Sequence, residues 1–128
     1  MKSKITLIIP LYFVFVSILF SQVFVNQAGY KALLPKYFYT NIQATSFEVV
    51  EENTGNTFFT GQLALISSYD PATGMSIRKG DFSNLTREGR YFIRLNTNDS
   101  SYHFTISNSV FQEVFNKSLK AFYFQRCG

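Results

Sequence analysis

The sequence has few of the residue types that most often carry chemistry. Its 128 residues include no tryptophan, one histidine and one cysteine. The single cysteine, Cys127, cannot form an internal disulfide. The single histidine, His103, has no serine or cysteine at a spacing typical of a nucleophilic triad, so we interpret it as a surface imidazole. These scarcities exclude a disulfide framework and a recognisable triad.

Long apolar segments are also scarce. The one long run, Ile5–Phe20, follows Lys2 and Lys4 and is shorter than the roughly 20 apolar residues that a membrane span needs. A basic start, an apolar run and then small or polar residues are typical of an export signal. We therefore predict a signal peptide over residues 1–21, cleaved after Ser21, and a secreted protein, extracellular or periplasmic, without a stable membrane anchor. An uncleaved N-terminal anchor is the alternative.

Clusters of positive charge are missing from the remaining 107 residues. Without Lys2 and Lys4, ten basic residues face eight acidic ones, and no run of lysine and arginine forms a stripe that phosphates could bind. We therefore exclude nucleic acid as a partner. A chain of this size can bury one modest hydrophobic core, and we expect a monomer.

Aromatic residues, by contrast, make up 18% of the chain, and they favour strands. Short β-prone segments separated by turn residues predict an all-β sandwich over residues 22–107. The clearest hairpin turns at Asn53-Thr54-Gly55-Asn56. The predicted strands are 23–25, 36–40, 47–52, 57–63, 75–79, 90–95 and 101–106.

Alternation of apolar and polar residues assigns the faces of the last two strands. The residues expected to share the inward face are Tyr91, Ile93, Leu95, Tyr102, Phe104 and Ile106. A slip of one residue would bury Arg94 and His103, so the register is well specified.

The hydrophobic period changes to that of a helix at residue 109. Ser109 is a candidate N-cap with Gln112 as its capping-box partner, and Glu113 and Lys117 are spaced for an ion pair. The apolar positions are Phe111, Val114, Phe115, Leu119, Phe122 and Tyr123. Leaving this stripe in water would forfeit roughly 1.5–3 kcal/mol for each large side chain. Since the sandwich can cover only part of the stripe, we expect residues 108–128 to begin a further unit.

Six short segments share their residues and their order with one known family. They are Val25–Tyr30 (VNQAGY), Thr54–Gly55, Thr60–Leu63, Gly80–Ser83, Gly89–Tyr91 and Leu119–Gly128. Together, over about residues 23–128, they resemble the N-terminal immunoglobulin-like domain of glycoside hydrolase family 9. The last segment resembles the helix that opens the catalytic domain of that family.

The resemblance implies an immunoglobulin-like β-sandwich followed by an (α/α)6 barrel that hydrolyses β-1,4-glucans with inversion. That reaction needs two carboxyl groups about 6.5–9.5 Å apart. The family's Asp-Ala-Gly-Asp base motif and its acid are not in this chain, so we expect no catalytic or cofactor-binding residue here and no activity from this piece alone. The implied partners are its own barrel and, through it, a β-glucan. The alternative is a stand-alone exported immunoglobulin-like module for carbohydrate binding or adhesion.

The resemblance also implies a metal ligand. In several family members a cysteine in the segment that corresponds to Gln125–Gly128 joins a Cys-His pair and a further histidine around a structural zinc. Cys127 would supply one ligand, the other three would follow Gly128, and a calcium is implied in the full-length enzyme as well. The alternative is a partly buried thiol at a helix end.

Other conspicuous residues have structural interpretations. Asp81 and Ser83 are expected to bond nearby backbone at a strand end, although Asp81 could also be interpreted as a catalytic acid. Glu51 and Glu52 are neighbours in a strand and should point to opposite faces.

Four aromatic residues complete the candidates. Tyr91 is expected to form a tyrosine corner, with its hydroxyl bonded to upstream backbone. Phe24, Tyr37 and Phe92 could stack on sugar rings. We favour packing against the implied barrel, because such platforms are usually Trp or Tyr and the chain has no Trp.

Overall fold

The computed structural model describes residues 22–72 and 74–125. Within these ranges the chain forms strands followed by one helix. In order they are β1 (Val23–Phe24), β2 (Tyr37–Thr40), β3 (Ser46–Glu51), β4 (Thr57–Ser67), β5 (Ile77–Asp81), β6 (Gly89–Leu95), β7 (Phe104–Ile106) and α1 (Val110–Gln125).

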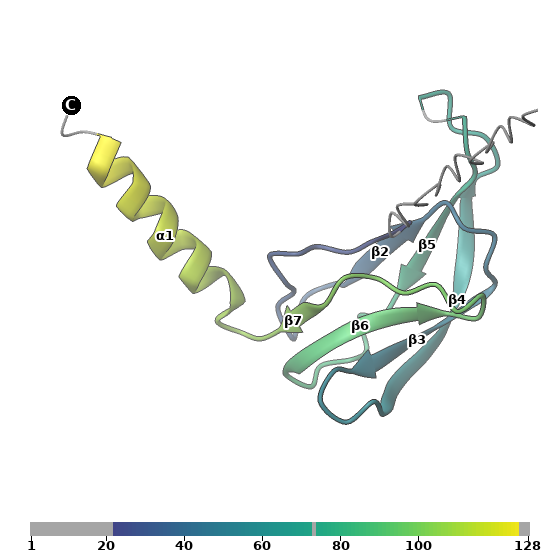
Figure 1. Ribbon diagram of the computed structural model, residues 1–128, viewed down its shortest axis with the longest axis horizontal. Helices are drawn as coiled ribbons and strands as arrows, with labels where there is room; N and C mark the ends of the chain where they lie inside the picture. Colours follow the sequence, from purple (N-terminus) through teal and green to yellow (C-terminus); the bar gives the residue numbers. More distant parts are fainter. Residues whose placement is uncertain (1–21, 73, 126–128) are drawn as a thin grey trace, which may run out of the picture.

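The strands pair antiparallel in the order β1-β2-β5-β4-β3-β6-β7 (Figure 1). The long strand β4 is shared between two layers, because residues 57–62 pair with β3 whereas residues 63–67 pair with β5. Register shifts in β3 and β4 mark bulges, which bend strands locally. The sheet therefore folds over on itself at β4, and the predicted sandwich is confirmed.

The segment after β1 crosses from the first layer to the second. Tyr30 N donates to Thr105 O at 2.9 Å, and Ser107 N donates to Tyr30 O at 3.0 Å. These bonds form a parallel bridge between Tyr30 and Ile106. Residues 23–30 therefore contact the outer edges of both layers.

The core between the layers is largely aromatic. Tyr30 packs edge to face against Phe82 and Phe104, with ring centroids 5.1 and 5.2 Å apart. Such pairs contribute about 0.5–1.5 kcal/mol beyond the area they bury. Five of the six residues expected to face inward are buried, namely Tyr91, Ile93, Leu95, Phe104 and Ile106.

Tyr102 is the exception, and its predicted orientation was wrong. Its side chain is 60% exposed, whereas Ser101 is buried and its Oγ accepts a hydrogen bond from Ile93 N at 2.9 Å. Because β7 begins only at Phe104, the alternation of a regular strand does not extend back to residues 101–103.

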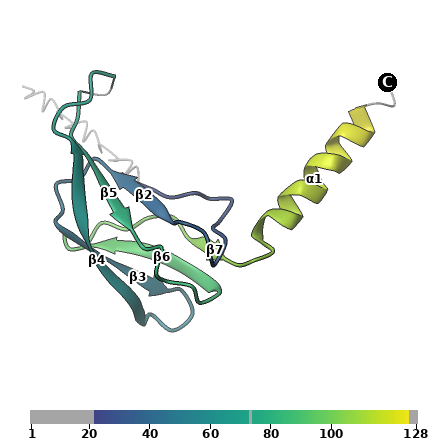
Figure 2. The same ribbon diagram turned by 180° about the vertical axis from the view of Figure 1, so that it is seen from behind.

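The helix α1 projects away from the sandwich in both views (Figures 1 and 2). None of its residues is buried, and the six predicted stripe residues are between 38% and 70% exposed. Glu113 and Lys117 form the expected ion pair at 2.6 Å, and the hydrogen bond from Lys117 lowers the pKa of Glu113. Among residues 22–72 and 74–125, no helix is long and apolar enough to cross a membrane.

The start of α1 differs from the predicted capping box. Gln112 N donates to the backbone oxygen of Ser109 at 2.9 Å, while the Ser109 hydroxyl pairs with that of Ser107 at 3.1 Å. Ser109 N also donates to Ser107 Oγ. A backbone bond thus replaces the expected side-chain cap, because the hydroxyl of Ser109 is turned toward Ser107.

Candidate functional site

The two neighbouring glutamates at the end of β3 point apart, as predicted. Glu51 lies 3.8 Å from Arg87, whereas Glu52 pairs with Arg90 at 2.8 Å and lies 3.9 Å from His103 Nδ1. Each carboxylate therefore has its own arginine partner on its own side of the strand. His103 is on the polar face, as expected.

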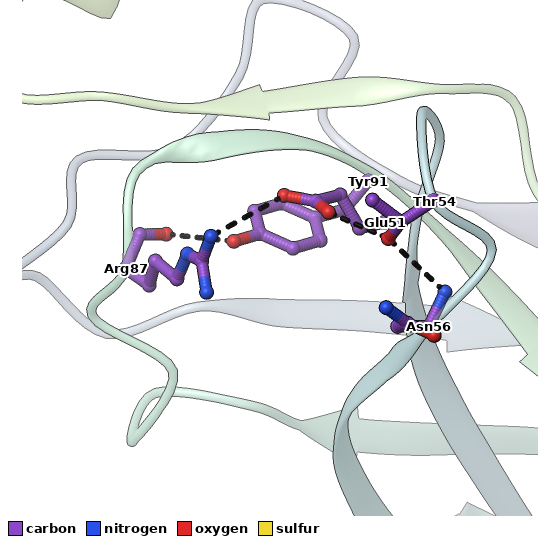
Figure 3. A network of polar contacts seen from close by, with 5 residues as sticks. All are labelled: Glu51, Thr54, Asn56, Arg87 and Tyr91. Atoms are coloured by element: carbon purple, nitrogen blue, oxygen red, sulfur yellow. Dashed lines mark hydrogen bonds and ion pairs between the residues drawn. The ribbon is translucent and has the colours of Figure 1, made fainter.

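Tyr91 forms the predicted tyrosine corner (Figure 3). Its buried ring places the hydroxyl where it donates to Arg87 O at 3.2 Å, and burial raises the pKa of the phenol. The Arg87 guanidinium extends toward Glu51, which accepts a bond of 2.7 Å from Thr54 Oγ1; that hydroxyl in turn accepts from Asn56 N at 3.3 Å. The network ties the turn of the first hairpin to the loop before β6, so its role is structural.

Asp81 is held at the end of β5 by its own loop. Ser83 donates to Asp81 Oδ1 twice, from its amide at 2.9 Å and from its hydroxyl at 2.6 Å. These bonds lower the pKa of the Asp81 carboxyl. Ser83 Oγ also accepts from Lys36 N at 3.0 Å. The structural interpretation of Asp81 is confirmed, since its Oδ1 accepts both bonds from the loop at the strand end.

The three candidate stacking residues have different surroundings. The Tyr37 ring is covered by Lys79 Nζ, 3.5 Å from its centroid, and Phe92 packs edge to face against His103. Phe24 is 59% exposed and lies opposite Tyr39 in the β1–β2 pair. Phe24 and Tyr39 border an apolar groove of about 370 Å³. Its other lining residues are Thr40, Asn41, Ile66, Met75 and Ile77.

The Val25–Tyr30 motif contacts the segment that connects β7 to α1. We call these two segments, residues 25–30 and 105–110, the joint between the sandwich and α1. Asn26 Oδ1 accepts from Ala28 N at 3.1 Å and Asn26 O accepts from Gly29 N at 3.0 Å, which closes a tight turn. The Tyr30 hydroxyl accepts from Asn26 N at 2.9 Å and donates to Tyr37 O at 2.8 Å. Burial raises the pKa of this phenol. The motif therefore locks the crossing segment onto both layers.

Gly29 has a φ of 99° and lies directly against the first helical residue. A Cβ on Gly29 would be 2.3 Å from Val110 Cγ2 and 2.7 Å from Thr105 O. Only a residue without a side chain allows this approach. On the other side of the joint, Asn108 N donates to Glu88 Oε1 at 2.7 Å.

An open cleft of about 660 Å³ lies beside the joint, between the 27–28 turn and the first two turns of α1. Its lining is mixed in polarity and includes Gln27, Thr105, Val110 and Lys117.

Lys36 is a buried charged residue that the sequence analysis did not single out. Its side chain is fully buried, and Nζ donates to Ala32 O at 2.7 Å, to Leu34 O at 2.9 Å and, more weakly, to Lys31 O at 3.5 Å. Burial lowers the pKa of this ammonium, and the nearby Asp81 carboxylate partly offsets the effect. No local pattern marks Lys36, because a lysine beside a strand is usually a surface residue.

Cys127 and residues 1–21, on which the zinc and export predictions rest, lie outside the described residues. In the part of the chain that is described, no three His, Cys, Asp or Glu side chains lie close enough together to hold a metal ion.

Comparison with known proteins gives consistent matches. The family described as "Cellulase N-terminal ig-like domain" matches residues 20–100. A cellodextrinase of Butyrivibrio fibrisolvens is 36% identical over 107 residues, which cover 84% of this chain and 19% of the relative. Endoglucanase D of Acetivibrio thermocellus is 27% identical over 108 residues, covering 84% and 17%.

Solved structures agree with the sequence matches. A glycoside hydrolase family 9 structure from Bacteroides ovatus has a TM-score of 0.70 at 26% identity, covering 82% of this chain and 19% of that one. A metagenome-derived endoglucanase of the same family has a TM-score of 0.65 at 26% identity, covering 73% and 19%. The chain spans less than a fifth of the length of each of these proteins.

Proposed function

Since this chain belongs to the family of cellulase N-terminal immunoglobulin-like domains, we propose that it is the non-catalytic front module of an exported enzyme that hydrolyses β-1,4-glucans. In this role the sandwich supports a catalytic domain that begins with α1 and continues after Gly128. The substrate class follows from the relatives, which are a cellodextrinase and endoglucanases.

The observation that carries the proposal is the exposed apolar stripe of α1. Its large side chains include Phe115, Phe122 and Tyr123, which are 58%, 70% and 69% exposed. Burying each of them would contribute about 1.5–3 kcal/mol, and the sandwich covers none of them. A following domain that packs on α1 would recover this free energy, and the relatives are long enough to have one.

The chain itself is proposed to be inactive, because Glu51 and Glu52 pair with different arginines and Asp81 accepts hydrogen bonds from its own loop. Purified residues 22–128 should release no reducing sugar from soluble cellulose. Turnover that survives rigorous purification would refute the proposal. A complementary test is the nucleotide sequence after the Gly128 codon, where the proposal expects an open frame that encodes Cys-His and Asp-Ala-Gly-Asp.

Export is proposed from residues 1–21 and from the relationship to cellulases. N-terminal sequencing of protein collected outside the cytoplasm should begin at Gln22. Recovery of the protein only with Met1 intact in the cytoplasm would contradict this assignment.

Cys127 is proposed as a zinc ligand only in a longer chain. The described residues do not supply the other three ligands, so residues 22–128 alone should bind no zinc. In a chain extended past the Cys-His segment, metal analysis should find one zinc that is lost in Cys127→Ser. Absence of zinc from both extended chains would refute this role.

A carbohydrate-binding module is the second candidate, and the exposed Phe24–Tyr39 pair is the observation that favours it. The groove beside this pair is almost entirely apolar, whereas sugar sites need polar groups that match hydroxyls. A cellulose pull-down separates the two functions: strong retention of residues 22–128, abolished by Phe24→Ala, would favour the second.

A further inference from the structure

The loop between the joint and β2, residues 31–36, exposes two adjacent leucines. Leu33 is 79% exposed and Leu34 is 52% exposed. Single exposed leucines are common on protein surfaces, but apolar side chains grouped on one surface often mark an interaction site.

The backbone of this loop is held by hydrogen bonds from Lys36 Nζ. The three carbonyl oxygens that surround Lys36 Nζ all belong to this loop, and Ala32 is buried in the core. Burying an ammonium is costly unless its hydrogen bonds are satisfied, so any loop conformation that removes these carbonyls is strongly disfavoured. A rigid loop loses little conformational entropy when a partner covers it. The leucines are therefore presented in a form ready for binding.

The loop lies at the end of the sandwich from which α1 departs (Figures 1 and 2). Tyr30 is hydrogen-bonded to Ser107, which is three residues before Val110. Leu33 is three residues after Tyr30, so their Cα atoms are at most about 11 Å apart. The exposed leucines and the exposed stripe of α1 therefore flank the same joint.

We propose that Leu33 and Leu34 are the contact by which the sandwich docks on the polypeptide that follows Gly128. This inference rests on the proposed function and adds the surface that the sandwich contributes. The occupant is indicated by position and length: the chain leaves the sandwich at this joint, and the relatives have more than four fifths of their length outside the match. A unit built on α1 would lie within reach of the loop.

The experiment uses a chimera in which residues 22–128 replace the matching segment of the Butyrivibrio fibrisolvens cellodextrinase. Calorimetry is run on the chimera, on its Leu33→Asp/Leu34→Asp variant and on a control, Leu65→Asp/Ile66→Asp. The control leucine and isoleucine are 53% and 58% exposed and lie on the C-terminal half of β4, which runs to the side of the sandwich opposite α1 (Figure 1). The same substitutions in residues 22–128 alone report the stability of the sandwich.

The unsubstituted chimera should unfold in one coupled transition. The loop variant should split it into two transitions or lower its midpoint by at least about 4 °C, while the control and the variants of residues 22–128 keep their midpoints. One unchanged transition in the loop variant would overturn the docking role of the loop and leave the proposed function intact. Two independent transitions in the unsubstituted chimera would overturn both. Concentration-dependent dimers of residues 22–128 that the loop variant abolishes would identify a second copy as the occupant and overturn the proposal.

Discussion

Replacing Gly29 by alanine should lower the free energy of unfolding by more than the positive φ of residue 29 alone would cost. A positive φ costs an alanine about 1–2 kcal/mol. The new Cβ would also lie 2.3 Å from Val110 Cγ2 and 2.7 Å from Thr105 O. Overpacking of this kind adds about 1–3 kcal/mol. The expected loss in the free energy of unfolding is therefore about 2–5 kcal/mol.

Gly55 provides the matched control for this experiment. It has a φ of 69°, and a Cβ there would meet nothing within 4 Å. Gly55→Ala should lower the free energy of unfolding by about 1 kcal/mol. The cost of the positive φ is partly offset, because alanine also reduces the entropy of the unfolded chain. Urea denaturation of residues 22–128 measures both variants, with equal m-values showing that the unfolded states are comparable.

Val110→Ala tests which atom causes the clash with Gly29→Ala. Combining the two substitutions should recover part of the loss, with a coupling free energy of about 0.5–3 kcal/mol. Recovery stays incomplete, because the carbonyl of Thr105 belongs to the backbone and remains. If Gly29→Ala and Gly55→Ala cost the same within about 0.5 kcal/mol, the close approach of helix and turn is refuted.

Three further substitutions test the sandwich. Tyr91→Phe should cost about 1 kcal/mol in urea denaturation by removing the corner hydrogen bond, whereas the exposed Tyr69→Phe should cost nothing; equal effects would contradict the corner. The pKa of Asp81 is lowered in the folded state, so its contribution to the free energy of unfolding is complete above the ordinary value of 3.8 and is lost as pH falls through the folded-state pKa. Asp81→Asn should therefore make stability fall less steeply at acid pH, and an unchanged dependence on pH would count against this role. Gly80→Ala should be severely destabilising in thermal unfolding, since its Cβ would overlap the buried Phe38 ring at 2.0 Å; a near-native midpoint would refute that packing.

Much of the fold could be predicted from local sequence patterns. Turn residues such as Asn53–Asn56 and the alternation in 90–95 specify strands within a few residues, because backbone preference and pleat act over short distances. The helical stripe after residue 109 and its ion pair follow from the 3.6-residue period. The tyrosine corner at Tyr91 was predictable because its hydroxyl bonds backbone only four residues away.

The candidate site was less accessible to such reasoning. The Val25–Tyr30 motif was recognisable by resemblance, but its physical role depends on a contact with Val110, which is more than 80 residues away in sequence from Gly29. Ser101 and Tyr102 exchanged their expected faces, because the Ser101 hydroxyl bonds the amide of Ile93 on the next strand. Partners of this kind cannot be read from alternation.

The sequence by itself therefore determined the strand and helix periods, the turns and the family relationship, all of which depend on neighbouring residues or on ordered motifs. Only the tertiary structure decided that Lys36 is buried among three loop carbonyls, that β4 joins two layers, and that the described residues leave α1 exposed. The physical reason is that burial and hydrogen-bond satisfaction depend on which distant segments meet. The same local preferences for strand, turn and helix are compatible with many different contacts between distant segments.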